Sequence, residues 1–182
     1  PGPMSETPRP RALLSVSDKT GLIDLARAGI PAQIVSMPLA GAAAPITLLG
    51  SVVQHAAECI SGMTIHQLAQ PGSPIVWGGA PAIMDMRQGT TPMGAVETAM
   101  IDAAYAQVGK SFGFPTHTYL GASDSKLVDY QAGMESSTTA MIGALLGMET
   151  KIFMGVTDVE RQSVNVHKMK LCGAEVIPAA GS

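Results

Sequence analysis

The chain has 182 residues, of which 46% are hydrophobic, so it is long enough for one globular domain with a buried core and short for two. Charged residues make up only 14%, and the net charge of -3 comes without a basic run, so neither a nucleic-acid surface nor a polybasic membrane patch is indicated. Cys59 and Cys172 lie far apart in the sequence, which predicts no disulfide framework and favours a reducing, cytoplasmic location.

The first ten residues, PGPMSETPRP, are rich in proline, which disfavours regular structure. They have neither the charged region nor the apolar region of a signal peptide. We therefore expect a tag or disordered leader over 1–10 and a single α/β domain over 11–182. The apolar runs that follow are interrupted within about 18 residues, which argues against a transmembrane helix.

Strand-like and helix-like segments then alternate along the chain. Short apolar or β-branched runs, typical of buried parallel strands, lie at 11–16, 32–37, 74–79, 116–121, 151–156 and 174–180. Segments of helical composition lie at 20–28, 47–69, 95–112, 130–147 and 158–172. This alternation predicts right-handed βα units around a parallel sheet. A complete TIM barrel has eight strands in about 250 residues, so the expected α/β fold is an open sheet or a partial or rearranged TIM-type barrel.

Several predicted helices have recognisable ends. Pro71 and Gly72 should stop the helix at 47–69, and glycine and proline after residue 112 should stop the next one. Asp158 is placed to cap the last helix, and Gly173 is placed to follow its end.

The segment SVSDKTG follows the first predicted strand and opens a helix. Its Ser17, Lys19 and Thr20 would offer hydroxyls and an ammonium group to a phosphate beside free backbone amides. The alternative, which we favour, is that Ser17 or Asp18 only caps the helix.

Four further candidates gather at the expected carboxyl ends of strands, where α/β proteins bind their ligands. Trp77 and Tyr119 end two predicted strands, and Asp85 and Arg87 follow the first of these strands. Aromatic faces and a carboxylate suit an alkylammonium ion, so the two rings with Asp85 or Asp124 would supply a cage for one. The alternatives are a core position for Trp77 and a simple ion pair between Asp85 and Arg87.

The stretch GASDSKLVDYQAGMES lies between Tyr119 and the predicted helix at 130–147. By composition alone it is a helix start: Asp124 or Ser125 would be a cap, and the acidic residues that follow would form a solvated first turn.

His55 and Cys59 are spaced i, i+4 on the helix predicted at 47–69, beside Glu58. This spacing suits metal ligands. A buried polar pair is the favoured interpretation, because no second cluster shows ligand spacing, and no metal site is predicted.

Three longer stretches occur in order and at the expected intervals: AGIPAQIVSMPLAGAAAPITLLGSVVQHAAE, PGSPIVWGGAPAIMDMRQGTTPMGAVE and GASDSKLVDYQAGMES. Over about residues 25–147 they resemble the trimethylamine methyltransferase family, corrinoid-dependent enzymes that include relatives acting on glycine betaine. The resemblance implies TIM-type barrel strands, a small methylated amine as substrate and a separate corrinoid protein as methyl acceptor, with no cofactor bound directly. It also makes Asp124, Lys126, Asp129 and Gln131 expected members of the substrate site, beside Trp77, Asp85, Arg87 and Tyr119 from the strand ends.

The implied reaction moves a methyl group from a tertiary or quaternary amine to the Co(I) of the corrinoid, and the barrel orients that group in line. The trimethylamine enzymes use a pyrrolysine, which the sequence does not show. This favours a quaternary amine as substrate, because its leaving group is neutral once the methyl has departed; the alternative is that the pyrrolysine belongs to a part of the enzyme that is missing here.

The two ends resemble other families. Residues 9–27 are similar to the opening of the IMP cyclohydrolase and AICAR transformylase family, and residues 151–182 are similar to the tryptophan synthase β chain, without its Schiff-base lysine motif. We therefore predict a composite chain with a purine-enzyme-like unit, a methyltransferase-like barrel segment and a tryptophan-synthase-like unit, at 11–27, 28–148 and 149–182. The alternative function is an engineered or shuffled α/β protein without catalytic activity. Exposed sheet edges would favour a homo-oligomer.

Overall fold

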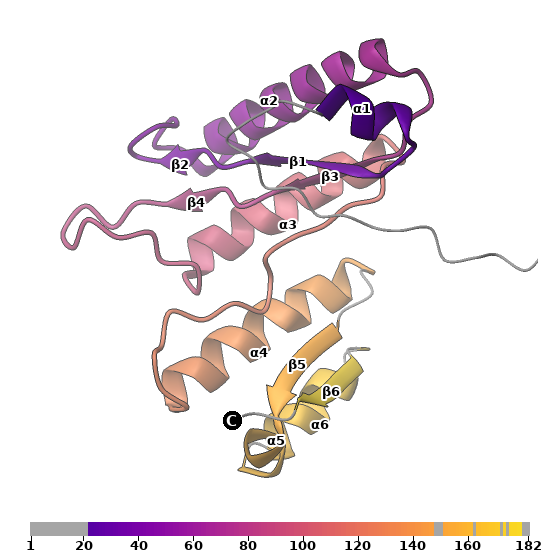
Figure 1. The fold of residues 1–182 in the computed structure, drawn as a ribbon. Coiled ribbons are helices and arrows are strands. Elements are labelled where there is room, and N and C mark those ends of the chain that lie inside the picture. The colour runs from indigo at the N-terminus through magenta and orange to yellow at the C-terminus, as the bar shows by residue number, and fades with distance from the viewer. Residues whose placement is uncertain (1–21, 148–150, 162, 172, 174, 180–182) are drawn as a thin grey trace, which may run out of the picture.

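The computed structural model describes residues 22–147, 151–161, 163–171, 173 and 175–179 (Figure 1). The strand predicted at 11–16 and the candidate phosphate ligands Ser17, Lys19 and Thr20 lie outside these residues. The elements follow in the order α1 (Leu22–Arg27), β1 (Ala32–Ser36), β2 (Leu39–Ala40), α2 (Leu48–Ala69), β3 (Ile75–Gly79), β4 (Ala82–Ile83), α3 (Val96–Ser111), α4 (Tyr130–Leu145), β5 (Lys151–Gly155), α5 (Val156–Arg161), α6 (Ser163–Leu171) and β6 (Glu175–Ala179).

The first half of the fold is built on parallel strand pairing. β1 pairs with β3, with Ile34 opposite Trp77, and β2 pairs with β4 in the same direction. The Ala82 N–H donates to the Pro38 carbonyl at 3.2 Å, which carries the hydrogen-bond ladder from the first pair into the second. Pro38 and Pro81 have no N–H group and fall where each strand is interrupted. The strands predicted at 32–37 and 74–79 and their parallel direction are confirmed.

Helices α2 and α3 cover one face of this strand pair, and small residues let them approach closely. A Cβ on Gly62 of α2 would lie 3.2 Å from the Ile34 side chain, and one on Gly109 of α3 would lie 2.5 Å from the Trp77 ring. The main core lies here and contains Ala40, Val52, Cys59, Met63, Ile75, Trp77, Ile101 and Tyr105. The high content of alanine and glycine in the sequence thus serves close packing of helices on strands.

The strand predicted at 116–121 is wrong in length. Only Thr116 forms a parallel bridge, opposite Trp77, and two backbone hydrogen bonds of 2.8 Å flank it. Gly121 has a φ of 97°, in the left-handed region where the chain turns rather than extends. The segment nevertheless lies beside β3, where a third parallel strand would lie.

The helix ends follow the sequence signals in most cases. Thr47 caps α2 by accepting from the Gly50 N–H at 3.2 Å, and Gly72 and Gly113, with φ of 79° and 76°, follow the ends of α2 and α3. Asp158 is an exception. The predicted helix at 158–172 begins earlier, at Val156, and is divided into α5 and α6, so Asp158 lies inside α5 and not at its start. Gly173 follows α6 with a φ of 90°, as predicted.

The second half of the fold contains its own parallel pair. β5 pairs with β6, with Ile152 opposite Val176, and a small core of Val166, Met169 and Val176 lies beneath them. Helix α4 lies between the two halves and contacts α3 on one side and α6 on the other (Figure 1).

The described residues therefore form a mixed α/β fold whose strands occur as three parallel pairs. The predicted alternation and parallel direction are confirmed, whereas no closed barrel is seen among these residues. The two longer pairs do not share a sheet, and the strand predicted at 116–121 is reduced to a bridge. In the part of the chain that the structure describes, no helix combines the length and apolar character needed to cross a membrane.

Candidate functional site

The helix-facing side of β3 carries an aromatic cluster. Trp77 is completely buried, and its indole N–H donates to the Tyr105 carbonyl at 3.1 Å. The His55 ring stacks on Tyr105 with centroids 4.4 Å apart and meets Trp77 edge-on at 5.6 Å. The Phe114 ring also stacks on Trp77, with ring centroids 6.1 Å apart. The structure thus places Trp77 in the core, away from the exposed strand ends. A core position was the alternative to a place in an exposed ligand cage.

His55 and Cys59 form a buried polar pair on α2. The His55 Nε2–H donates to the Gly78 carbonyl at 3.0 Å, and the Cys59 thiol donates to the same carbonyl at 3.4 Å. Burial lowers the pKa of His55 and raises the pKa of Cys59 to about 11. Both groups are therefore neutral near pH 7 and satisfy a strand carbonyl, as the favoured interpretation expected. Among the described residues, no three His, Cys, Asp or Glu side chains are grouped as a metal site.

Asp102 on α3 is the most unusual ionisable group in this core. It is 2% exposed, and its Oδ1 atom has no hydrogen-bond partner. Burial raises its pKa to about 7. The neighbouring Tyr105 hydroxyl has the carbonyls of Gly79 and His117 as acceptors, at 3.0 and 3.2 Å.

The opposite face of the β1–β3 pair carries a polar contact that spans three chain segments. The Gln33 side chain on β1 crosses over Gly78 on β3 and reaches the His117 Nδ1 atom, 3.0 Å from its Nε2. A Cβ on Gly78 would lie 2.4 Å from the Gln33 amide nitrogen, so glycine provides the space for this crossing. Because side chains alternate along a strand, Gln33 and Gly78 lie on the face away from α2 and α3.

Tyr119 extends this face. Its ring meets the His117 ring edge-on, with centroids 5.2 Å apart, and the residue is 41% exposed. Burial lowers the pKa of His117, so its imidazole is neutral near pH 7. Gln33, His117 and Tyr119, here called the open-face group, together present an aromatic ring, a neutral imidazole and an amide on an accessible surface.

Asp124 joins two loops through hydrogen bonds to backbone N–H groups. Its Oδ1 accepts from the Met93 N–H at 2.9 Å and its Oδ2 from the Gly94 N–H at 2.7 Å. It thereby fixes the loop that follows β4 to the loop that precedes α4. Both oxygens are occupied by backbone donors, so the main role of this carboxylate in the described structure is to hold the loops.

Glu135 on α4 holds the backbone at Asp124 through hydrogen bonds. One oxygen accepts from the Ser123 hydroxyl at 2.7 Å and from the Asp124 N–H at 2.9 Å, and the other accepts from the Gln131 amide at 2.9 Å. Burial acts to raise the pKa of Glu135, but these hydrogen bonds outweigh it and the pKa is lowered. Gly94 is closely packed here, since a Cβ on it would lie 2.4 Å from the Glu135 carboxyl group.

Replacing Asp124 with alanine should release both loops. The loss of two hydrogen bonds to a carboxylate is expected to lower the free energy of unfolding by roughly 1–3 kcal/mol. Hydrogen exchange at the Met93 and Gly94 amides should accelerate more than exchange in α2. Asp24→Ala is the control, because Asp24 makes only a 3.9 Å ion pair on the surface. Unchanged exchange at the two amides would contradict this role.

Other predicted site residues take structural positions at the same edge. Asp85 accepts from the N–H groups of Arg87 and Gln88 at 2.8 and 3.3 Å, so it stabilises a turn. No ion pair joins the Asp85 and Arg87 side chains in the described structure. Asp129 is the N-cap of α4, accepting from the Ala132 N–H at 2.9 Å.

Lys126, Gln131 and Arg87 are exposed on these loops and on the first turn of α4. The structure therefore brings Asp124 together with Gln131, through Glu135, and leaves Trp77 apart in the core. Gln33 and Glu135 were not predicted as site residues. Gln33 is a polar residue inside an apolar strand, and that interruption was the available signal; Glu135 is spaced i, i+4 from Gln131.

Comparison with known proteins gives a consistent relationship. A family model described as trimethylamine methyltransferase (MTTB) matches residues 12–154. The chain is 36% identical over 146 residues to the trimethylamine methyltransferase MttB of Methanosarcina thermophila, covering 80% of this chain and 30% of that protein. It is 38% identical over 126 residues to MttB of Desulfitobacterium hafniense (strain DSM 10664 / DCB-2), covering 69% and 25%. It is 37% identical over 127 residues to the glycine betaine methyltransferase of Desulfitobacterium hafniense (strain Y51), covering 70% and 26%.

These matches bear on the predicted composite. The family match begins at residue 12 and continues past residue 27, so it includes most of the segment that resembled a purine-biosynthesis enzyme. The comparisons support neither that resemblance nor the resemblance of 151–182 to tryptophan synthase, and the predicted composite is not supported. The chain spans about 30% of the length of the Methanosarcina relative.

Proposed function

The chain belongs to the trimethylamine methyltransferase family, and on that premise we propose that it forms part of a corrinoid-dependent methyltransferase that takes a methyl group from a tertiary or quaternary amine. The acceptor would be a corrinoid held by a partner protein. The relatives are named for trimethylamine and for glycine betaine, and both compounds present methyl groups on nitrogen. Because the chain spans about 30% of the first of these relatives, the function assigned to its own residues is binding and orienting the amine.

The open-face group is the proposed binding surface, and its chemistry supports this assignment. A methylated ammonium ion has few or no N–H donors, so aromatic faces and neutral polar groups bind it better than hydrogen-bond acceptors alone. Tyr119 is 41% exposed and offers the ring. Gln33 and His117 lie beside it and are joined by a 3.0 Å contact that holds both side chains in place.

The protonation state of His117 makes this surface sensitive to pH. Partial burial lowers the pKa of His117 from its ordinary value of 6.5. The ring is therefore mostly neutral at pH 6.5 and becomes protonated only at a lower pH. Protonation at lower pH would place a positive charge beside a cationic ligand. Binding should therefore be constant above neutral pH and weaken as the pH falls through the lowered pKa of His117.

The remaining predicted residues are assigned supporting roles. Asp124 and Asp85 hold the backbone of the loop that follows β4, and Trp77 supports β3 from the helix side. The exposed Arg87 and Lys126 carry cationic groups of the kind that suits the carboxylate of glycine betaine. Asp129 and Gln131 order the start of α4.

Calorimetric titration of the chain with glycine betaine and with trimethylamine hydrochloride at pH 7.5 tests the proposal. The expected result is saturable heat for both ligands. The dissociation constant should rise about 2- to 30-fold in Tyr119→Ala, the range of a cation–π contact. Tyr130→Ala is the matched control, because Tyr130 is 82% exposed and lies outside the open-face group. No saturable heat in a sample that melts cooperatively, or equal heat in all three proteins, would contradict amine binding at this surface.

A further inference from the structure

Tyr105 on α3 links β3 to the neighbouring segment at 115–119. Its ring is completely buried and stacks on His55, with centroids 4.4 Å apart. Its hydroxyl donates to the Gly79 carbonyl at 3.0 Å and to the His117 carbonyl at 3.2 Å. Because a hydroxyl has one hydrogen, the two carbonyls share it. One side chain of a helix thus contacts the backbone of both segments.

These two carbonyls are the acceptors that the next two hydrogen bonds of the parallel ladder would use. The Trp77 N–H donates to the Pro115 carbonyl and the His117 N–H donates to the Trp77 carbonyl, both at 2.8 Å. In a parallel pair this pattern repeats every two residues. The ladder would therefore continue from the Gly79 N–H to the His117 carbonyl and from the Tyr119 N–H to the Gly79 carbonyl. Neither bond forms among the residues that the structure describes.

The Tyr105 hydroxyl is well suited to replace these two bonds. Burial raises the pKa of Tyr105, so the hydroxyl keeps its hydrogen near neutral pH. The Asp102 carboxyl lies one turn earlier on α3, but its Oδ1 atom has no partner and the hydroxyl is directed at the two carbonyls. The hydroxyl therefore serves the backbone of the two segments.

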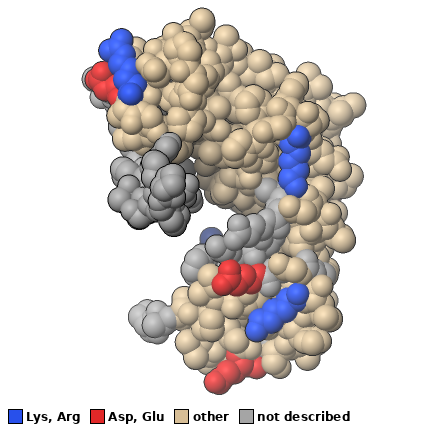
Figure 2. Space-filling view, turned by 90° about the vertical axis from the view of Figure 1, so that its right-hand side faces the viewer, with Lys and Arg blue, Asp and Glu red and all other residues tan. Residues whose placement is uncertain are grey.

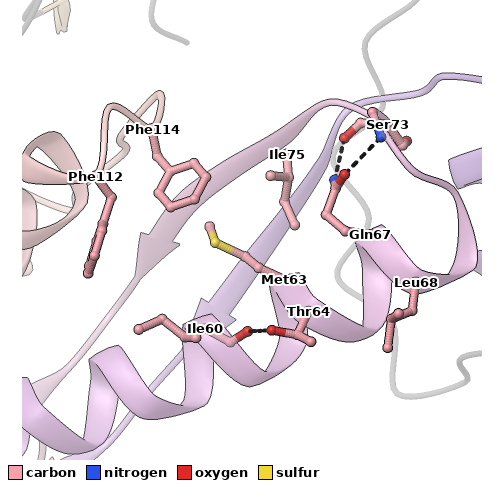
Figure 3. Close-up of a pocket in the computed structure, with 10 residues that line it drawn as sticks. Ile60, Met63, Thr64, Gln67, Leu68, Ser73, Ile75, Phe112 and Phe114 are labelled. Atoms are coloured by element: carbon pink, nitrogen blue, oxygen red, sulfur yellow. Dashed lines mark hydrogen bonds between the residues drawn. The ribbon is translucent and has the colours of Figure 1, made fainter.

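The start of the segment at 115–119 is held by packing and not by charge. Among the described residues, the one ion pair joins Arg27 and Asp24 on the surface. Charged side chains are also few and scattered on the face shown in Figure 2. The Phe114 ring, in contrast, stacks on Trp77 and lines an apolar groove together with residues of α2 and β3 (Figure 3).

The open-face group is arranged around His117. The His117 and Tyr119 rings meet edge-on, with centroids 5.2 Å apart. Gln33 reaches the imidazole from β1 at 3.0 Å. Both contacts depend on where the backbone places His117, and the carbonyl of this residue is the one that Tyr105 holds.

We propose that Tyr105 is a positioning residue for the open-face group, whose hydroxyl replaces the next two hydrogen bonds of the ladder and so fixes the backbone at His117. Its relevance to amine binding rests on the proposed function. Tyr105 acts through His117, since its own ring is buried on the helix side and does not reach the open face. Without the hydroxyl, both carbonyls lose their donor, and the two missing ladder bonds are the nearest replacement. The Tyr119 N–H would then pair with β3.

Hydrogen exchange of Tyr105→Phe at pH 6 tests this role, at a pH where Asp102 is still largely protonated in the folded state. Phenylalanine keeps the buried ring, so the variant should fold. In the wild type, the Tyr119 amide should exchange faster than the His117 amide, which donates to a strand carbonyl. In Tyr105→Phe, exchange of the Tyr119 amide should slow about 2- to 10-fold, the effect of one added hydrogen bond. A general loosening of the core would speed it instead.

Ile101→Val is the matched control. Ile101 lies on the same helix and is also completely buried, so its substitution loosens the same core and leaves the hydroxyl in place. Exchange of the Tyr119 amide should not slow in this variant. The proposal is overturned if Tyr105→Phe shows no slowing or if both variants slow equally. It is also overturned if the wild-type Tyr119 amide is already as protected as that of His117, a comparison that needs no variant.

Calorimetric titration with glycine betaine separates this role from the proposed function. If the wild type binds, the dissociation constant should rise about 2- to 30-fold in Tyr105→Phe and stay unchanged in Ile101→Val. Equal affinity in all three proteins would overturn the positioning role. If the wild type binds no amine, the proposed function fails, and hydrogen exchange still decides whether the Tyr105 hydroxyl places His117.

Discussion

Asp102→Asn is expected to stabilise the folded chain above pH 7. Asp102 is 2% exposed and its Oδ1 has no partner, so its ionised form is unfavourable in the core. Burial raises its pKa from an ordinary 3.8 to about 7. A difference of roughly three pKa units corresponds to on the order of 4 kcal/mol. Asparagine has nearly the same shape and no charge, so most of this cost should disappear in the variant.

The direction of the pH dependence follows from proton binding. Between about pH 4 and pH 7 the folded state keeps the Asp102 proton and the unfolded state has released it. The folded state thus binds more protons, and the free energy of unfolding falls as the pH rises through this window. The stability that protonated Asp102 contributes is fully present below its ordinary pKa of 3.8 and is lost above the raised pKa of about 7.

Urea unfolding at pH 4, 5.5, 7 and 8 measures the effect. Lowered pKa values of His55 and His117 act in the opposite direction, but both proteins share them, so the difference between wild type and Asp102→Asn isolates Asp102. Asp24→Asn, with a side chain that is 82% exposed, is the control. Parallel curves for wild type and Asp102→Asn would show that the carboxyl group is not buried as described.

Trp77→Ala is expected to lower the free energy of unfolding by about 3–5 kcal/mol, the usual cost of deleting a buried tryptophan. The ring is fully enclosed, packs against His55 and Phe114, and donates to the Tyr105 carbonyl. Its removal leaves a cavity and an unpaired carbonyl. Thermal melts and urea unfolding at pH 7 would measure the loss.

Tyr119→Ala supplies the contrast. Tyr119 is 41% exposed, so its removal should change stability by much less than removal of Trp77 while weakening amine binding. If Trp77→Ala were as stable as the wild type, the core position of the ring would be contradicted. Loss of ligand binding in Trp77→Ala would not distinguish unfolding of the chain from loss of a contact with the ligand. Tyr119→Ala can make this distinction, because that variant should stay folded.

Helix positions could be predicted well from the sequence, because their determinants are local. Pro71 with Gly72 and Gly113 end α2 and α3 through backbone preferences that do not depend on tertiary contacts. Asp129 was placed correctly at the start of α4, although the cap was assigned to Asp124 or Ser125. All three have suitable side chains, and only the tertiary contact of Asp124 with the loop of Met93 separates their roles.

Strands were harder to predict than helices, because a strand depends on hydrogen bonds to a neighbouring strand that is distant in the sequence. The run at 116–121 has β-forming residues, yet only Thr116 pairs, because a strand needs a neighbour along its whole length. The open-face group could not be identified from spacing either. Gln33 and His117 are 84 residues apart in sequence, and Gly78 lets them meet across β3.

The comparisons do not support the predicted composite, and there is a physical reason why short segments suggested one. A buried strand followed by a capped helix is a pattern that many unrelated α/β proteins share, since local sequence rules dictate it. The segments 9–27 and 151–182 are each about one or two such units in length. The match over 12–154 extends across several units in order and carries more information than either short segment.

The most direct test of the central claim is titration of the ¹⁵N-labelled chain with glycine betaine, followed by amide chemical shifts. We expect the largest saturable changes at Gln33, Gly78, His117 and Tyr119, and their loss in Tyr119→Ala. Saturable shifts confined to other surfaces, or no shifts at millimolar ligand in a folded sample, would contradict the assignment of amine binding to the open face of the β1–β3 pair.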